Sequence, residues 1–365
     1  MNVGFVLDSL KRGGAQKMMA FVIQSVASMY DNVYLLLEDT DNIGYQLPAN
    51  VIVKKFFLAK EKKGLIQKMA GVYKKIKGLR ACLEQYHITL LCSFGCYYTF
   101  ISAVASSRHN ISLIGSERRS PRDLSFVWRI LSKYSYNKCT KVVFQLDGAM
   151  SCFGGKIRKK AVVIPNPCFQ EKDFSKEFII RKHNSIALAA ARLEYVKGFD
   201  VAIKALPRVL EEIPDAFIEI YGAGDFEKEY GKLINRLHLN ERVFYKGFSN
   251  NIIDEISKSA VFVLPSRYEG IPNILLEALA AGIPCIASNC RPGGPQMLIG
   301  NNERGILFEN ENTGDLAKCL IMVLKDKALA DKISTAAQEV RIMFSPSVIG
   351  EKWVRCFEGC KKDYE

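Results

Sequence analysis

Long apolar runs, paired metal-ligand motifs and clustered histidines are all missing from this 365-residue sequence. Since no stretch of about 18 apolar residues occurs, we expect no membrane-spanning helix. The eleven cysteines lack Cys-x-x-Cys spacing, which argues against zinc and favours reduced thiols in a cytoplasmic protein. The opening MNVGFVLDSL has the pattern of a strand, so we expect no secretory leader. The four histidines are dispersed: His87, His109, His183 and His238.

Acidic side chains are also in short supply. The 51 lysines and arginines exceed the 38 aspartates and glutamates, which gives a formal net charge of +13. This surplus indicates an acidic partner, namely phosphates, an anionic membrane surface or nucleic acid. No zinc-finger or RRM motif is present, and the aromatics are not interleaved as a base-stacking platform. We therefore expect no nucleic-acid partner.

The segment 261–281, VFVLPSRYEGIPNILLEALAA, predicts a strand, a loop and a helix that together form a ligand site. Val261–Leu264 is an apolar, β-branched run typical of a buried strand, and Pro272 suits the first position of a helix. Ligands of open parallel sheets bind at the carboxyl ends of strands, where this loop lies. Glu277 is a carboxylate in an apolar helix segment, where burial is costly without a partner. A solvated helix face and a ligand role both remain open for this residue.

Two glutamates give this segment a family resemblance. Glu269 and Glu277 have seven residues between them, and Gly-Ile-Pro-Asn follows the first. The pattern resembles the paired-glutamate motif of retaining glycosyltransferases of family 4. That resemblance implies the GT-B fold, which has two facing Rossmann-like parallel-sheet domains, an interdomain cleft and a C-terminal helix that crosses back to the first domain. Alternating strand and helix signals along the chain independently favour an α/β protein with two parallel-sheet domains.

The resemblance also implies a role for each motif residue. Glu277 would accept hydrogen bonds from both ribose hydroxyls of a nucleotide sugar. Glu269 would contact hydroxyls of the donor sugar. The loop and helix start between them would face the sugar and its diphosphate, and it consists of Gly270, Ile271, Pro272 and Asn273.

Arg192 and Lys197, which precede Gly198, match the phosphate clamp of the same family. A departing nucleotide diphosphate develops negative charge, which two fixed cations and helix-start amides can stabilise without a metal. Loop cations are ordinarily solvated, but the two glutamates downstream favour the clamp. Further donor contacts are implied at glycine-rich turns and at one aromatic: Gly13, Gly14, Gly222, Gly247 and Phe248.

The segment after the predicted strand Ile111–Gly115 indicates acceptor contacts. Many family members carry a histidine near this point, but the four histidines here lie elsewhere, so no histidine role is expected. Gly-Ser-Glu-Arg resembles bacterial enzymes that add GalNAc or related sugars to polyprenyl-diphosphate-linked glycans. On that resemblance Glu117 would orient the acceptor hydroxyl, and Arg118, Arg119 and Arg122 would hold its diphosphate. A basic loop that pairs internally is the alternative.

Lys54–Arg80 is the most basic part of the chain and predicts a helix with an apolar stripe and a lysine-rich face. Such a helix can lie on anionic lipid, with Phe56 and Phe57 as interfacial anchors. A stripe that packs on its own domain beneath solvated lysines is the alternative. The resemblance favours the membrane, and hence a cytoplasmic protein peripheral to the inner face of the plasma membrane. The lysine face comprises Lys62, Lys63, Lys68, Lys74, Lys75 and Lys77.

We therefore expect an acceptor-binding domain over residues 1–168, completed by a helix at 346–365, and a nucleotide-sugar-binding domain over 169–345. The expected reaction is retaining, metal-independent transfer of a hexose or N-acetylhexosamine, with GalNAc favoured. The donor would be a UDP-sugar and the acceptor a polyprenyl-diphosphate-linked oligosaccharide. GDP-mannose, UDP-glucose or a non-lipid acceptor remain open. So do a metal-dependent reaction at Asp39 and Asp41, and an inactive nucleotide-sugar- or membrane-binding module.

Overall fold

The protein divides into two compact units. Its structure, a computed structural model, describes residues 1–11, 13–57, 65–118, 125–169 and 181–361. Unit 1 contains Met1–Asn166 together with the chain from Ser347 onward, and unit 2 contains Pro167–Pro346. The sequence predicts these divisions after residues 168 and 345.

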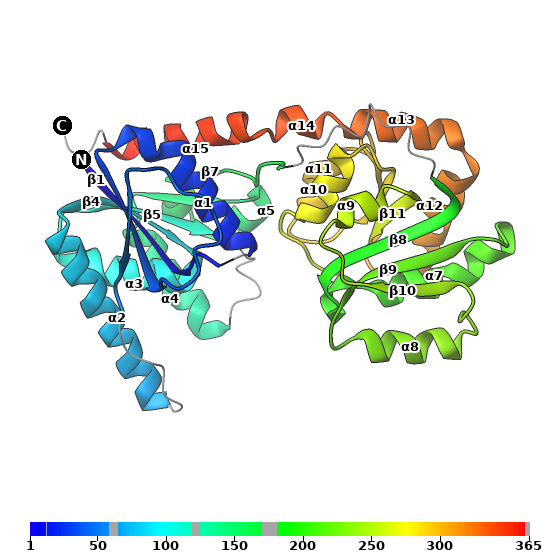
Figure 1. The fold of residues 1–365 in the computed structure, drawn as a ribbon, viewed down its shortest axis with the longest axis horizontal. Coiled ribbons are helices and arrows are strands. Elements are labelled where there is room, and N and C mark those ends of the chain that lie inside the picture. Colours follow the sequence, from blue (N-terminus) through cyan, green and yellow to red (C-terminus); the bar gives the residue numbers. More distant parts are fainter. Residues whose placement is uncertain (12, 58–64, 119–124, 170–180, 362–365) are drawn as a thin grey trace. The chain divides into compact units, whose positions relative to one another are not determined.

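Unit 1 is built on a seven-stranded sheet in the order β3-β2-β1-β4-β5-β6-β7 (Figure 1). All neighbouring strands are parallel. The strands are β1 (Asn2–Ser9), β2 (Asn32–Asp39), β3 (Val51–Lys55), β4 (Ile88–Phe94), β5 (Ser112–Glu117), β6 (Lys141–Phe144) and β7 (Ala161–Val163). The helices are α1 (Gly14–Val26), α2 (Leu65–Gln85), α3 (Gly95–Ala105), α4 (Phe126–Lys138), α5 (Asp147–Met150), α6 (Gly155–Arg158) and α15 (Pro346–Lys361).

The C-terminal helix α15 belongs to the core of unit 1. Trp353 is fully buried, and its ring stacks on Phe94 at the end of β4 with 6.0 Å between centroids. Phe357 stacks in the same way on Phe5 of β1, at 5.8 Å. Buried aromatics of this size dominate core energetics, so α15 is an integral part of the unit.

Unit 2 repeats the architecture with a six-stranded parallel sheet in the order β10-β9-β8-β11-β12-β13. The strands are β8 (Lys182–Arg192), β9 (Phe217–Ala223), β10 (Val243–Gly247), β11 (Ser259–Leu264), β12 (Cys285–Ser288) and β13 (Ile306–Phe308). The helices are α7 (Phe199–Glu212), α8 (Glu227–Arg236), α9 (Ile252–Ile256), α10 (Asn273–Ala280), α11 (Gly294–Ile299), α12 (Thr313–Lys325), α13 (Lys327–Ala337) and α14 (Val340–Met343). The predicted pair of parallel-sheet domains is thus confirmed.

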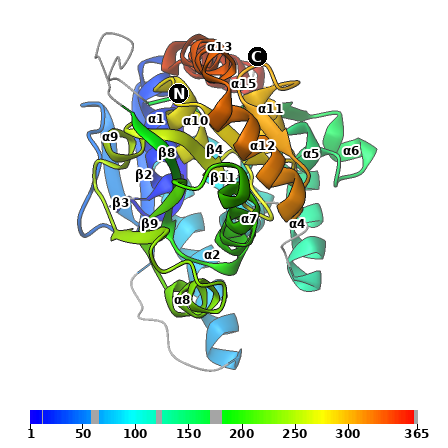
Figure 2. The ribbon, with the colours of Figure 1, turned by 90° about the vertical axis from the view of Figure 1, so that its right-hand side faces the viewer.

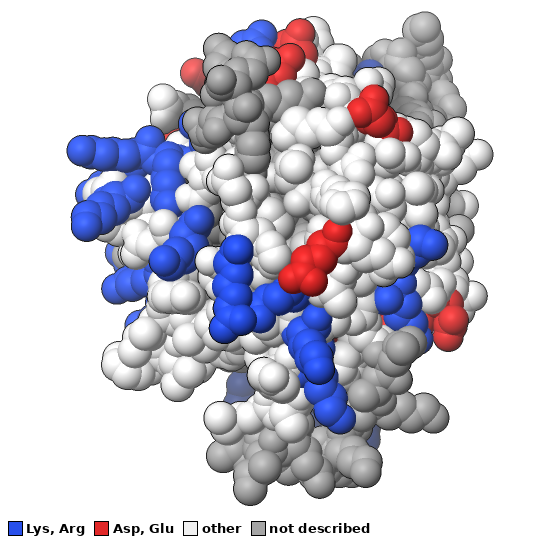
Figure 3. Space-filling view, turned by 90° about the vertical axis from the view of Figure 1, so that its left-hand side faces the viewer, with Lys and Arg blue, Asp and Glu red and all other residues white. Residues whose placement is uncertain are grey.

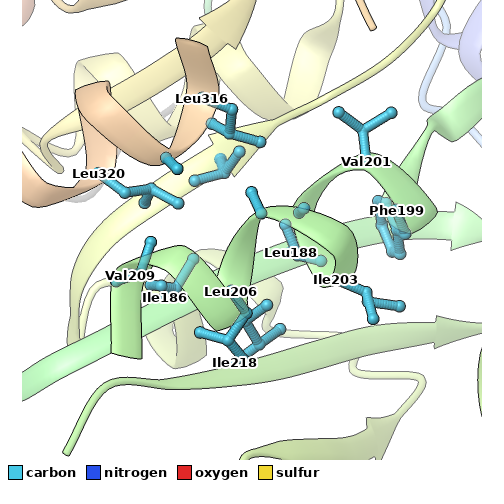
Figure 4. Packing of buried hydrophobic residues seen from close by; sticks show 14 of the residues in the cluster. Ile186, Leu188, Phe199, Val201, Ile203, Leu206, Val209, Ile218, Leu316 and Leu320 are labelled. Atoms are coloured by element: carbon cyan, nitrogen blue, oxygen red, sulfur yellow. The ribbon is translucent and has the colours of Figure 1, made fainter. Parts of the chain in front are cut away.

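The core of unit 2 lies where α7 and α12 cover the central strands, and Figure 2 shows these two helices side by side. Phe199 and Leu206 of α7, Leu316 and Leu320 of α12 and Ile186 of β8 all belong to one buried apolar cluster (Figure 4). Strands covered on both faces become continuously apolar, as in the buried stretch of β8. This packing fixes the ends of β8, β9 and β11, on which the candidate site depends.

The basic region differs from the face that the sequence predicts. Phe56 and Phe57 are buried in unit 1, so they are not interfacial anchors. Lys75 is not on a solvated face either, since it is only 3% exposed and its Nζ lies 2.9 Å from a carboxylate oxygen of Glu38. The ammonium group also faces the rings of Phe57 and Tyr97, at 5.2 and 5.3 Å. Within the predicted face, Lys74 and Lys77 are exposed, while Lys62 and Lys63 lie outside the described residues.

We expect Lys75→Met to lower the free energy of unfolding by roughly 2 kcal/mol, because it leaves the half-buried Glu38 carboxylate without its cation. The matched control is Lys74→Met on the next, exposed position of α2, which should change stability by less than about 0.5 kcal/mol. Urea unfolding of both variants checks this. Equal stabilities would contradict a buried ion pair.

Candidate active site

A cavity of ≈ 430 Å³ lies in unit 2 beside the carboxyl ends of β8, β9 and β11. Its size falls within the range of small-molecule sites, and its place is that of ligand sites in open α/β sheets. The predicted residues that line it are Lys197, Gly222, Phe248, Glu269, Ile271, Pro272, Asn273 and Glu277. The structure therefore brings both motif glutamates and one clamp cation, far apart in sequence, to one cavity.

Lys197 and Glu269 form an ion pair in the cavity wall. The Lys197 Nζ lies 2.8 Å from Glu269 Oε1, and both side chains are largely buried. The Ser266 hydroxyl donates to the same oxygen at 2.9 Å, and the Glu269 amide donates to the carbonyl of Arg291 at 3.1 Å. These contacts fix the carboxylate. An ammonium group has three donor protons, so Lys197 can hold Glu269 and an anionic ligand together.

Helix α10 supplies the second carboxylate. Pro272 is its N-cap and the helix begins at Asn273, one residue later than the sequence predicts. Asn273 and Glu277 are four residues apart, so they lie on one side of the helix, and both line the cavity. The flanking Leu276 and Ala278 are buried in the core. A half-buried carboxylate beside buried apolar residues suits a site that recognises hydroxyl groups.

Arg267 fastens the two loops that carry the ion pair. It lies between β11 and Glu269, and its guanidinium donates to both carboxylate oxygens of Asp200, at 2.8 and 2.9 Å. It also donates to the carbonyl of Tyr195 at 2.7 Å and lies 3.9 Å from the centre of that ring. The Arg267 amide donates to the carbonyl of Val196 at 2.9 Å. The turn before Lys197 is thus joined to the loop of Glu269 by a bidentate, stacked arginine, which is the strongest form of such contact.

The pKa shifts of Asp200 and Arg267 agree with the geometry of their ion pair. Burial alone would raise the pKa of the Asp200 carboxyl, but hydrogen bonds from Arg267 and Lys204 outweigh it and hold the pKa below its ordinary value. The pKa of Arg267 is raised, chiefly by its hydrogen bonds to Asp200. Both groups therefore remain charged at neutral pH.

The turn after Lys197 also requires a glycine at position 198. Its φ of +66° lies in the left-handed region, and a Cβ there would stand 2.1 Å from the carbonyl oxygen of Pro265. Only glycine combines this conformation with so close a backbone approach. The turn after Lys197 can therefore lie directly against the loop that follows β11.

Several predicted donor residues do not line the cavity. The Arg192 side chain is 80% exposed and pairs with Glu194 at 3.2 Å, so in this structure it does not join Lys197 as a second clamp cation. Gly247 and Gly270 lie next to lining residues without lining the cavity themselves. In unit 1, the Gly13 amide donates to the Tyr45 hydroxyl at 3.0 Å, whereas a Cβ on Gly14 would meet open space.

Sequence reasoning missed Tyr221 and the alanines 189–191, which also line the cavity. Three successive small residues at the end of a buried strand were a usable signal, because they leave room beside the strand. The Tyr221 hydroxyl donates to Glu219 at 3.3 Å, and Glu219 accepts from Lys182 at 2.7 Å. That chain of contacts joins residues of neighbouring strands and could not be seen in the sequence.

In unit 1 the predicted acceptor residues have different environments. Glu117 is 2% exposed and accepts hydrogen bonds from the Tyr136 hydroxyl at 2.5 Å and the Arg118 amide at 2.9 Å. Its carboxylate is thus used inside the unit, which corrects the prediction that it orients an acceptor hydroxyl. Arg119 and Arg122 lie outside the described residues.

The hydrogen bonding of Arg118 differs from that of Glu117. Its Nη2 donates to Asn166 at 2.8 Å, and its guanidinium lies 5.3 Å from the ring centre of Phe94. Its Nε and Nη1 are buried and have no hydrogen-bond partner in the described part of the chain. Burial lowers the pKa of Arg118 to about 10, so the group stays charged at neutral pH. A buried cation with unpartnered donors is costly and favours an anionic ligand.

The alternative acidic pair, Asp39 and Asp41, is engaged locally. Asp39 pairs with Lys11 at 2.6 Å and accepts the Asp41 amide at 2.9 Å. Across the residues that the structure describes, no group of three or more His, Cys, Asp or Glu side chains is arranged to hold a metal ion.

Residues 170–340 match the family described as Glycosyl transferases group 1. The chain contains a group 1 glycosyltransferase domain. The matched segment includes Lys197, Glu269 and Glu277, and it confirms the predicted enzyme class, glycosyltransferase.

Similar proteins agree with this class and with the fold. A Campylobacter jejuni relative, 24% identical over 97% of this chain and 98% of its own, is named as an α-1,4-N-acetyl-D-galactosaminyltransferase of a GalNAc- and diNAcBac-containing glycan on diphosphoundecaprenol. An Escherichia coli relative, named UDP-Gal:α-D-GlcNAc-diphosphoundecaprenol α-1,3-galactosyltransferase, is 31% identical over 47% of this chain and 46% of its own. Several other curated relatives match over only 18% to 63% of their length.

Among solved structures, Anabaena HepE in complex with UDP superposes with a TM-score of 0.76 at 19% identity. The superposition covers 98% of this chain and 100% of that one. Likeness at this identity concerns the fold, and it confirms the predicted GT-B class.

Replacing Arg267 by lysine should lower the free energy of unfolding by about 1–2 kcal/mol, because a single ammonium cannot make the bidentate pair or the stack on Tyr195. Hydrogen exchange of the amides at 195–200 should accelerate in the same variant. Denaturant unfolding and exchange measurements check both, with the exposed Arg208→Lys on α7 as control. Unchanged exchange in this turn would contradict the fastening role.

For Gly198→Ala we expect a loss of at least about 2 kcal/mol in unfolding free energy, since the Cβ meets a backbone oxygen in a left-handed turn. Gly231→Ala is the matched control. It lies inside α8 with nothing within 4 Å of the new Cβ, so alanine should be neutral or stabilising by up to about 1 kcal/mol. If both variants unfolded alike in urea, the close approach at Gly198 would not matter.

Proposed function

We propose that the protein transfers a hexose or N-acetylhexosamine, GalNAc-like, from a UDP-sugar to a polyprenyl-diphosphate-linked acceptor with retention of configuration. The observation that carries this proposal is the cavity in which Lys197, Glu269 and Glu277 meet at the carboxyl edge of a parallel sheet. The names of the Campylobacter and Escherichia relatives, and the UDP bound in the HepE structure, support the substrate classes. Transfer from GDP-mannose or UDP-glucose is the alternative for the donor.

In the proposed donor complex, each polar group has one task. Glu277 accepts hydrogen bonds from the ribose hydroxyls, and Glu269 positions the hydroxyls of the sugar. Lys197 supplies positive charge to the diphosphate. Phe248, 63% exposed at the cavity, offers a ring face to the base. Small alanines at the end of β8 leave room for the nucleotide.

The proposed chemistry is displacement on one face of the sugar. The acceptor oxygen bonds to the anomeric carbon while the bond from that carbon to the diphosphate oxygen breaks. The hydroxyl proton passes to the departing diphosphate. The leaving group gains negative charge, which the Lys197 ammonium stabilises by pre-organised electrostatics. No protein nucleophile is needed, and we propose that no divalent ion is required either.

For the acceptor we propose Arg118 as the contact to the diphosphate. Its Nε and Nη1, buried and without a partner among the described residues, support this, because they can form a charge-assisted pair with a phosphate. Asn166, which also accepts from Gln145 at 2.8 Å, holds the guanidinium in place. An acceptor on a polyprenyl carrier places the protein at the inner face of the membrane. None of the described helices is long and apolar enough to cross a bilayer.

Replacing Lys197 or Glu277 by alanine should lower kcat/KM for UDP-GalNAc at least about 100-fold, because each removes charge or hydrogen bonds that act on the donor. Lys228→Ala, an exposed lysine of α8, is the matched control and should retain wild-type turnover. Coupled detection of UDP release with a diphosphate-lipid sugar acceptor measures this. Near-normal turnover in both site variants would contradict the donor assignment.

The rival reading is an inactive binding module. Wild-type protein that binds UDP but neither transfers nor hydrolyses any of UDP-GalNAc, UDP-GlcNAc, UDP-glucose, UDP-galactose or GDP-mannose would establish it. Full activity in EDTA would eliminate the metal-dependent alternative.

A further inference from the structure

Helix α4 exposes large apolar side chains along one side. Phe126, Val127, Ile130 and Tyr134 are 77%, 61%, 53% and 43% exposed. Phe126, Ile130 and Tyr134 recur every four residues, so they form a continuous stripe. Single exposed apolar residues are ordinary, but a stripe of aromatic and branched side chains on one helix marks an interaction surface.

The inward side of α4 combines aromatic and polar side chains. Tyr136 is fully buried and packs on Phe144 of β6 at 6.1 Å. Ser132 and Ser135 are also buried, and their hydroxyls donate to carbonyls of the helix itself, Arg129 at 3.0 Å and Leu131 at 2.6 Å. Trp128 packs against Tyr97 of α3 at 5.5 Å, which fixes the orientation of the helix. The stripe is therefore held toward the outside by the packing of the unit.

Helix α2 carries a similar but shorter stripe on the same side of unit 1. Met69 and Tyr73 are each 68% exposed and four residues apart. Helix α3 contacts both α2 and α4, and Figures 1 and 2 show the N-terminal ends of α2 and α4 projecting from the same side of the unit. Both stripes lie toward these projecting ends.

Basic residues accompany the apolar residues on each helix, and exposed Arg129 lies within the stripe of α4. Exposed Lys74 and Lys77 come after Met69 and Tyr73 on α2, and exposed Lys133 and Lys138 come after Ile130 on α4. Helix α4 contains no acidic residue, and the first on α2 is Glu84, near its C-terminal end. Figure 3 shows one face of the molecule, on which blue lysine and arginine side chains predominate over red acidic ones.

We propose that the projecting ends of α2 and α4, defined by Met69, Tyr73, Phe126, Ile130 and Tyr134, insert into an anionic lipid bilayer. Exposed apolar side chains accompanied by basic ones, without acids, match the acyl boundary and the anionic headgroups of such a bilayer. This rests on the proposed action on a polyprenyl-linked acceptor and identifies its membrane contact. It moves that contact from the lysine face predicted for Lys54–Arg80 to a two-helix surface.

Vesicle binding tests the surface without using the donor site. The probes are vesicles of phosphatidylcholine with phosphatidylglycerol, and of phosphatidylcholine alone. We expect Phe126→Ser with Ile130→Ser to weaken binding to the anionic vesicles at least tenfold. Lys74→Glu with Lys133→Glu should weaken binding to a similar degree at low salt and less at high salt. Ile342→Ser on α14, also 77% exposed, is the matched control and should bind normally.

Fluorescence locates the contact. The chain has two tryptophans, and Trp353 is fully buried, so brominated acyl chains should quench Trp128 of α4. Quenching should disappear in Trp128→Phe. Vesicle binding that persists unchanged in the Phe126 and Ile130 double variant, or wild-type binding without quenching, would overturn the proposal.

A second copy of the chain is the competing occupant. If the double variant changes the mass measured by light scattering while the wild type ignores anionic vesicles, the surface joins subunits and the proposal is wrong. Transfer to a water-soluble acceptor should be the same in the double variant and the wild type. Vesicle binding without any sugar transfer would instead contradict the proposed function and leave the membrane surface standing.

Discussion

The ion pair between Lys197 and Glu269 is the constraint on which the site depends. Its two partners stand on loops that follow different strands, so neither loop can move without separating the charges. A carboxylate in this largely buried position needs a cation, and a fixed cation is what a departing diphosphate needs. Arg267 and Gly198 serve this pair, one through hydrogen bonds between the loops and the other by allowing close backbone approach. Folding has already ordered the two charged side chains before any ligand binds, so the site is pre-organised.

Glu117 and Arg118 are neighbours in the sequence, but strand geometry gives their side chains different surroundings in unit 1. Glu117 ends β5 and turns into the unit, where Tyr136 satisfies its carboxylate. Arg118 comes next, beyond the strand, and two of its buried donors have no partner in the part of the chain that the structure describes. Side chains alternate between the faces of a strand, so adjacent charged residues meet different surroundings. One of the pair stabilises the unit, and the other has donors left for a ligand.

The lysine-rich stretch before α3 shows the limit of composition as evidence. Lys75 belongs by sequence to a solvated face, yet it is buried against Glu38 and two aromatic rings. Meanwhile the surface with the clearest partner chemistry includes α4, FVWRILSKYSYNK, whose exposed side cannot be told from the sequence alone. The side that faces outward is set by Trp128, which packs on Tyr97 of α3, and by Tyr136, which packs on Phe144 of β6. Periodicity cannot reveal these contacts.

The sequence by itself determined the alternation of strands and helices, the two parallel-sheet domains and the strand, loop and helix that carry both glutamates, because period, β-branched runs and turn residues are local properties. The GT-B class came from the family resemblance. So did the interest in Lys197, Gly222 and Phe248, which line one cavity with the two glutamates. Only the tertiary structure decided that Arg192 extends into solvent while Lys197 turns inward, that Glu117 is internal, and that Arg267 joins the two loops. These outcomes depend on which side chains meet across strands distant in sequence. Burial and pairing are settled by those long-range contacts, and no local pattern in the chain encodes them separately.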